Sequence, residues 1–417
     1  MKPIHHLSIA LFLGLAAITG ARGDMAINPA LLYYQAFLLE PHQSDADRDY
    51  LFTNNWSGMT LPERVGSLTD EYSSMAGMLK RAAQQPLPCD WGIDSSRGPA
   101  TLLPNLSHCK HGAQVLCLRA TWALQHGNEA AAQEALLTAF TLGRHSAPEG
   151  FLIGVLVQFA DEAIVYSAVA GNFSHFSPDT LQQLKAGFEA APARTTVADA
   201  IDQERVIHTG WLRNKIQSLQ REHPGNDAEV LEAIRSDAEL QGFTYSGGDG
   251  GPDTNVWPRI VAAAGGTSDG VIGLVRDLDP IYARLHSILL LPVTEFNAPA
   301  QQFDAERKTA ANPLLNILLP DAEAPRRKEF IIAVEAAMVR AAVAYKLKGE
   351  AGLQSVPDPC GKGPFAFQRF VFQGEDRGFQ LTSTYVATKG PVKMIFVEKD
   401  GPAITVLGPR AGQAVTP

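Results

Sequence analysis

The sequence has little charge, few cysteines and, after its N-terminal segment, no long apolar run. Charged residues make up 19% of its 417 residues, which excludes a solvating tail, and the apolar fraction of 45% excludes a wholly disordered chain. Acidic residues outnumber basic ones by 44 to 35, so the net charge of −9 argues against nucleic-acid binding, which needs clustered Lys and Arg. No later stretch approaches the ~18 apolar residues of a membrane-spanning helix. We therefore expect no membrane span in the mature chain.

The N-terminal segment has the three-part layout of a secretory signal peptide. Lys2 precedes an apolar run from Leu7 to Thr19, and Ala21-Arg22-Gly23 supplies small residues at the −3 and −1 positions of a cleavage site. The run is shorter than the ~20 residues that a helix needs to span a bilayer. We predict that residues 1–23 are removed and that the protein is exported to the periplasm or the extracellular space.

Export would place the four cysteines in an oxidising compartment, where disulfides can form. They are Cys89, Cys109, Cys117 and Cys360. A Cys89–Cys109 bridge would close a short loop and is the favoured pairing, with four free thiols as an equal alternative. Cys117 lies in an apolar stretch and is interpreted as a small buried side chain.

Helical periodicity dominates the chain up to residue 348. Apolar spacing and turn signals predict helices at 28–39, 61–85, 149–170, 178–190, 197–221, 227–240, 256–264, 269–291, 298–318 and 326–348, with a further pair at 113–146. Helix 149–170 is apolar almost all round, so it is expected to be central.

The character of the sequence changes after Pro357. Segments 364–373, 378–387 and 392–397 are rich in Phe, Val, Thr and Tyr and are separated by glycine-containing turns, which predicts a small antiparallel sheet. The predicted fold is mainly α: an irregular antiparallel helical bundle or short α-solenoid with a small C-terminal antiparallel β-sheet. We divide it into a helical domain at 24–292 and a region at 293–417, where helices precede a sheet module at 360–410.

Residues 113–146 contain two apolar helices joined at Gly127-Asn128. Ala120 and Ala132 are small enough to let the two backbones approach closely. The pattern resembles one tetratricopeptide-type unit, with Ala132 and Leu136 on second-helix positions that the repeat favours. This resemblance implies an antiparallel helical pair.

The C-terminal passage carries a second resemblance. YKLKGEAGLQSVPDPCGKGPFAFQRF, followed by GFQLTSTY, resembles the passage from helix to sheet in pseudopilin-type modules. Together with CDWGID and the 113–146 block, it is similar to exported helical-repeat-like proteins of environmental bacteria. No activity is assigned to that group, so the resemblance implies an architecture and no reaction.

The loop from Cys89 to Asp94 concentrates chemically useful side chains. Trp91 could serve as a binding platform, and Asp90 and Asp94 as acid–base groups or cation ligands. The favoured interpretation is structural: Trp91 holds the loop against the core, and the carboxylates accept hydrogen bonds from nearby backbone groups.

Asp161 and Glu162 interrupt the apolar helix 149–170. A buried carboxylate is costly unless it is paired, and Arg119 and Arg144 on the adjacent helices are the expected partners. We interpret the four residues as a structural ion-pair group, because no second acid or nucleophile accompanies them.

Other motifs lack the partners that their chemistry requires. His108 and His111 flank Cys109, but no second cluster supplies further zinc ligands. Ser107-x-x-Lys110 matches one motif of penicillin-recognising enzymes, whose later motifs are incomplete here. The glycines of segment 246–251 lack the lysine of a phosphate-binding loop. We predict no metal and no cofactor.

These features favour binding over catalysis. Paired helices build concave surfaces that hold peptides or partner proteins without catalytic residues. The leading hypothesis is an exported binding or scaffolding protein of the bacterial cell envelope, with a protein or peptide partner that the sequence does not identify. One alternative is a hydrolase with a cleft around Cys89–Asp94. A second is a pseudopilin-associated assembly factor with an open C-terminal strand edge.

Overall fold

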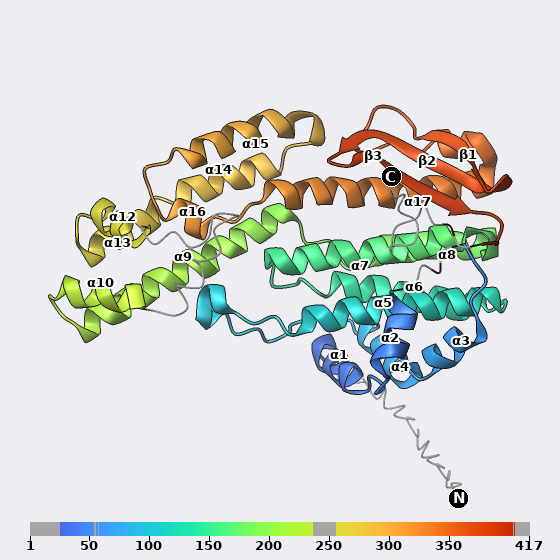
Figure 1. Ribbon diagram of the computed structural model, residues 1–417, viewed down its shortest axis with the longest axis horizontal. Coiled ribbons are helices and arrows are strands. Elements are labelled where there is room, and N and C mark those ends of the chain that lie inside the picture. The colour runs from blue at the N-terminus through green and yellow to red at the C-terminus, as the bar shows by residue number, and fades with distance from the viewer. Residues whose placement is uncertain (1–25, 54–55, 57, 237–255, 403, 405–417) are drawn as a thin grey trace, which may run out of the picture.

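The computed structural model describes residues 26–53, 56, 58–236, 256–402 and 404, and it shows a mainly helical protein with a small C-terminal antiparallel sheet (Figure 1). The predicted fold class is confirmed. Two parts lie along the long axis, and we call residues 29–190 with 323–397 the body and residues 197–318 the arm (Figure 1). The signal peptide predicted at 1–23 and the glycine segment 246–251 lie outside the described residues.

The elements of the two parts have the following bounds. The body contains helices α1 (Pro29–Leu38), α2 (Asp45–Phe52), α3 (Glu63–Asp70), α4 (Ser73–Ala83), α5 (Asn105–Gln125), α6 (Glu129–Arg144), α7 (Leu152–Gly171), α8 (Pro178–Ala190) and α17 (Glu323–Gln354), the 3-10 turns η1 (Ser95–Ala100) and η2 (Phe173–His175), and strands β1 (Ala366–Phe372), β2 (Glu375–Ala387) and β3 (Gly390–Val397). The arm contains α9 (Val197–Glu222), α10 (Asp227–Ser236), α12 (Val256–Ala263), α13 (Ser268–Arg276), α14 (Asp279–Leu289), α15 (Val293–Lys308) and α16 (Leu315–Leu318). The boundary predicted at 292 falls between α14 and α15, which contact each other.

Helix α7 lies at the centre of the body. It contacts α5, α6, α17, α9 and β3, as expected for a helix that is apolar on nearly every face. Among the described residues it is the one helix long and apolar enough to cross a membrane, and 72% of that window is buried inside the protein. Its apolar surface is therefore used for packing within the body.

Helices α5 and α6 form the predicted pair. The turn between them contains Gly127 at a φ of +73°, a conformation that glycine adopts without strain. Asn128 caps α6 by accepting a hydrogen bond from the Ala131 amide at 3.1 Å. Ala132 and Leu136 are fully buried in the core. The first helix begins at Asn105, ahead of the predicted start at 113.

The sheet is an antiparallel meander in the order β1-β2-β3. Phe379 of β2 pairs in register with Phe396 of β3 and with Arg369 of β1. Phe379 stacks on Phe396 with ring centroids 5.1 Å apart, and Tyr345 of α17 lies 5.0 Å from Phe379. This aromatic face covers α17 and α7 and joins the sheet to the body.

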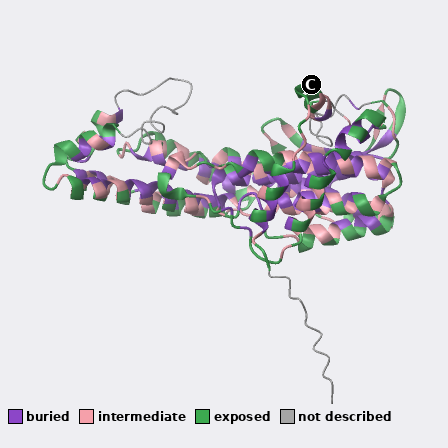
Figure 2. Cartoon of the chain, turned by 90° about the horizontal axis from the view of Figure 1, so that it is seen from below, coloured by how far each residue is buried: buried purple, intermediate pink, exposed green. Residues whose placement is uncertain are grey.

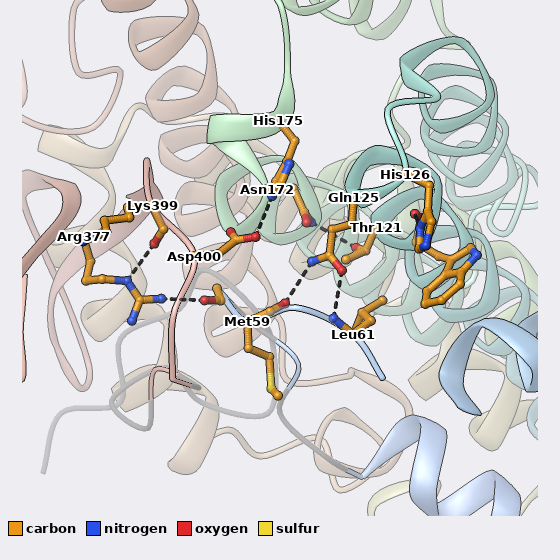
Figure 3. A network of polar contacts seen from close by, with 12 residues as sticks. Met59, Leu61, Thr121, Gln125, His126, Asn172, His175, Arg377, Lys399 and Asp400 are labelled. Atoms are coloured by element: carbon orange, nitrogen blue, oxygen red, sulfur yellow. Dashed lines mark hydrogen bonds and ion pairs between the residues drawn. The ribbon is translucent and has the colours of Figure 1, made fainter. Parts of the chain in front are cut away.

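A polar network fastens the end of the sheet to the N-terminal half of the body (Figure 3). The buried Arg377 donates to the carbonyls of Lys399 at 2.7 Å and Gly58. His175 of η2 and Asp400 approach to 2.8 Å. Because Gly58 and Arg377 are 319 residues apart, this network closes the body across nearly the whole chain.

The arm is thinner than the body and is built around α9. A capping box starts α9, with Thr196 and Asp199 each accepting a backbone hydrogen bond from the other. Helices α10, α13 and α14 contact α9. Buried residues fill the body but follow a narrow stripe between helices in the arm (Figure 2).

Several element boundaries differ from the sequence predictions. Helix α2 was not predicted, since only Leu51 of its eight residues is buried. The predicted helices 61–85 and 269–291 are each divided in two, with interruptions at Glu71-Tyr72 and Asp277-Leu278. Apolar periodicity continues through such breaks, so it does not reveal them.

Candidate functional site: an arginine-lined pocket beside Glu162

The predicted loop at Cys89–Asp94 is packed against the core. Trp91 is 4% exposed, lies 5.5 Å from Tyr33 between ring centroids, and donates from its indole nitrogen to the His145 carbonyl at 2.6 Å. Asp90 and Asp94 each accept a hydrogen bond from the amide two residues later, both at 2.9 Å. Their carboxylates thus shape the loop locally.

The structure has no Cys89–Cys109 bridge and shows the alternative that the sequence left equally open. All four cysteines are free thiols, and Cys89 and Cys109 are both buried. Burial, followed by the nearby Glu149 carboxylate, raises the pKa of the Cys89 thiol well above its ordinary value. A buried, protonated thiol forms a thiolate poorly, so Cys89 is unsuited both to disulfide exchange and to nucleophilic catalysis.

The predicted ion-pair group is only partly assembled. Arg144 pairs with Glu162, with 3.0 Å between Nε and Oε1. Arg119 instead points toward α3, where it donates to the Thr69 carbonyl and lies 3.6 Å from Asp70. Arg119 occupies the face of α5 that contacts α3, so the pairing expected for it is wrong.

Asp161 stays without a hydrogen-bond partner among the described residues, although both its oxygens are buried. Gly143 allows this close packing, because a Cβ there would lie 2.8 Å from the Asp161 Cβ. Burial, and then the Glu162 charge, raises the pKa of Asp161 well above its ordinary value, while Lys110 acts in the opposite direction. Burial therefore favours the neutral form of the Asp161 carboxyl group.

Glu162 holds a second arginine that the sequence did not indicate. Arg194, in the segment between α8 and α9, places Nε 3.1 Å from Glu162 Oε1 and also donates from Nη2 to Oε2. The side chain of Glu162 is 0% exposed, while those of Arg144 and Arg194 are 10% and 20% exposed. One carboxylate thus faces two guanidinium groups.

A pocket of about 370 Å³ opens beside this cluster, between α6, α7, α8 and α17. We call it the arginine pocket. Its lining residues are Phe140, Arg144, Tyr166, Lys185, Phe188, Glu189, Arg194, Ala333, Ala336, Val339, Arg340 and Pro359. Its volume lies within the ~300–1,000 Å³ typical of small-molecule sites.

The pocket carries an excess of positive charge. Lys185 pairs with Glu189 at 2.9 Å, and Arg144 and Arg194 share Glu162. Among the described residues, Arg340 forms no hydrogen bond or ion pair, although its charge acts on the Tyr166 hydroxyl. The three guanidinium groups thus outnumber Glu162, the one carboxylate that forms ion pairs with them, an arrangement that an anion would stabilise.

One wall of the pocket is aromatic. Phe140 lies 4.6 Å from Phe188 and 5.8 Å from Tyr166 between ring centroids, and the guanidinium carbon of Arg144 lies 4.9 Å from the Phe140 centroid. Burial, and then Glu162, raises the pKa of Tyr166 above its ordinary value, so its hydroxyl stays protonated. The wall can contact the apolar part of a ligand while the arginines bind its charge.

The lining suits binding better than catalysis. It includes no Ser, Cys or His, and its single lining carboxylate, Glu189, is paired with Lys185. In the described part of the chain, no group of three or more His, Cys, Asp or Glu side chains is arranged to hold a metal. The pocket therefore offers fixed cations and an apolar wall, without a nucleophile activated by a base.

Comparisons with known proteins give no match, so the function is argued from the geometry of the site. No protein-family model, no curated protein and no solved structure matches the chain.

Proposed function

We propose that this protein binds a small organic anion in the arginine pocket, as an exported binding protein of the bacterial cell envelope, and catalyses no reaction there. The observation that carries the proposal is the surplus of guanidinium groups around Glu162. Arg144, Arg194 and Arg340 line one pocket, and the buried Glu162 pairs with the first two of them. Guanidinium groups bind carboxylates and phosphates in a planar, bidentate geometry.

The aromatic wall narrows the class of ligand. Phe140, Phe188 and Tyr166 form the aromatic wall, and the other polar side chains of the lining are the cations and Glu189. The body of the ligand is therefore expected to be apolar and flat. An aromatic carboxylate or phosphate has this combination. A peptide or partner protein presenting such a group would also fit the binding role that the sequence favours.

Arg340 provides the sharpest test, because its replacement breaks no ion pair among the described residues. Calorimetric titration with benzoate and phenylphosphate should show binding, and benzylammonium, which has a similar shape and the opposite charge, should not bind. Arg340→Ala should weaken benzoate binding about tenfold or more, since a charge-assisted hydrogen bond contributes ~1.5–3 kcal/mol.

Lys348→Ala supplies the matched control, because Lys348 is an exposed cation on the same helix. It should bind benzoate as the wild type does. Equal binding of benzoate and benzylammonium, or unchanged affinity in Arg340→Ala, would refute the proposal. Export is tested separately by N-terminal sequencing of the protein from the envelope fraction, where the chain should start at Asp24.

The hydrolase and assembly-factor hypotheses can each be tested separately. The hydrolase hypothesis loses support from the buried, protonated Cys89, and a double Asp90/Asp94 variant would examine it if an activity were found. The assembly-factor hypothesis is based on strand β1, which pairs with β2 along one side only among the described strands and has Val371 60% exposed. Deletion of residues 360–417 should then remove partners in a pull-down from envelope extract.

A further inference from the structure

A second pocket also lies against α17, and it is lined by residues of that helix that do not line the arginine pocket. It is bounded by α7, α17 and the β2–β3 hairpin and has a volume of about 370 Å³. We call it the hairpin groove. Its lining residues are Leu156, Phe159, Ala160, Ala163, Lys328, Ile331, Ile332, Glu335, Ala387, Lys389, Gly390, Pro391, Val392 and Lys393. No residue lines both pockets, so the two are separate sites on the same pair of helices.

The floor of the hairpin groove is apolar and narrow. Leu156, Ala160 and Ala163 follow one face of α7 at helical spacing, and Ile331 lies on the facing side of α17. Ile153 continues the same face of α7 and is 53% exposed. An apolar stripe therefore continues from the groove along α7 to the exposed Ile153.

Charge at the groove has one predominant sign. Lys328 and Lys389 are exposed, Lys393 is half-buried, and the one acidic lining residue, Glu335, is 1% exposed. Lys328 and Lys393 alone outnumber the one buried carboxylate, so the rim is basic on a protein with a net charge of −9. This rim is complementary to an anionic group held at the mouth of the groove.

The composition of the lining decides between a peptide and an alkyl chain. Apart from the charged groups, the groove has no hydroxyl or amide side chain, and Pro391 lacks a backbone N–H. A peptide in this groove would bring backbone polar groups that no hydroxyl or amide side chain of the lining can satisfy, which costs free energy. A straight alkyl chain requires only apolar contact.

We infer that the hairpin groove binds a free single-chain carboxylate, with its alkyl chain over Leu156, Ala160 and Ile331 and its carboxylate at the lysine rim. This site shares no lining residue with the arginine pocket, so the inference does not depend on the function proposed above.

The test uses the full mature protein and decanoate as the probe. Calorimetric titration should show decanoate binding, with decylammonium at least tenfold weaker because the rim repels its charge. Ala160→Trp, which fills the groove, should weaken decanoate binding tenfold or more. Ala262→Trp on the exposed face of α12 is the matched control and should leave the affinity unchanged.

A second variant keeps the test valid if the tryptophan disturbs folding. Lys328→Ala/Lys393→Ala changes only side chains at the rim and should weaken decanoate binding about fivefold while leaving benzoate binding unchanged. Arg340→Ala should have the converse effect. Tight binding of decylammonium, full decanoate affinity in the rim variant, or binding to phosphatidylglycerol vesicles but not to monomeric decanoate would each overturn the inference.

Discussion

The body and the arm both have apolar interiors, but they differ in how deeply charged side chains are buried. In the body, Glu162 is completely buried between two arginines and Arg377 is 1% exposed. In the arm, the side chains of Arg284 and Glu306 pair while each is 46% exposed. A buried pair of the arm, Glu204 with His208, lies where α9 meets the body.

The Glu204–His208 pair lies at the boundary between the two parts. Glu204 accepts a hydrogen bond from the Leu152 amide at the start of α7, so it belongs to the contact between the two parts. Exposed pairs contribute little and tolerate replacement, whereas a buried charge must keep all its partners. Buried charges with several partners are therefore concentrated in the body, and the arm is held together mainly by apolar packing.

The largest effect is expected from Glu162→Ala. Removing this carboxylate leaves Arg144 and Arg194 buried without a counter-ion, which should lower the free energy of unfolding by about 3–5 kcal/mol. Urea unfolding followed by circular dichroism measures the loss. A variant within 1 kcal/mol of the wild type would show that the buried pair is not needed for the stability of the body.

A smaller loss is expected from Arg377→Ala. The guanidinium group donates to the carbonyls of Gly58, Lys399 and Pro402, and its removal should cost about 2–4 kcal/mol. Arg369→Ala is the matched control in the same sheet, since Arg369 is 42% exposed and pairs with Asp376 at the surface. Equal shifts of the urea midpoint in the two variants would contradict the comparison.

Asp161→Asn should change the pH dependence of stability. Because the pKa of Asp161 is raised in the folded protein, the wild type loses stability as pH rises from the ordinary Asp value of 3.8 toward the raised value. The asparagine variant lacks this loss, so its advantage over the wild type should grow across that window and then level off. Thermal unfolding of both proteins between pH 3.5 and pH 8 measures the gap, and a constant gap would contradict the neutral-acid assignment.

The smallest effect is expected in the arm, from Arg284→Ala. Both partners of its pair are exposed, so the urea midpoint should stay within error of the wild type at low salt and at 1 M NaCl. A loss approaching that of Glu162→Ala would remove the distinction between the two parts.

Much of the fold could be predicted from the sequence because it follows from local pattern. Helix α8 has the predicted bounds, since Ser177 caps it, Pro178 starts it and its apolar face has helical spacing. The three strands were identified by aromatic and β-branched residues between glycine turns. Helix α2 was missed because its residues are mostly polar and its start depends on one hydrogen bond to Ser44.

The site was harder to predict because it depends on which faces meet. Sequence indicated that the carboxylates of α7 need arginines and named Arg144, which pairs with Glu162. It could not show that Arg119 points toward α3, or that Arg194 reaches α7 from a connecting segment without periodicity. Arg340 lies within the 32-residue helix α17, where a single cation is ordinary.

The hydrogen bond from Arg377 to Gly58 has a consequence for biosynthesis. The two residues are separated by 319 positions, and the arm occupies the sequence between the two segments that form the body. A ribosome therefore completes α1–α8 and the whole arm long before it supplies the strand that locks them together. Contacts of such high sequence separation are slow to form, so the body should close only after β2 has been synthesised.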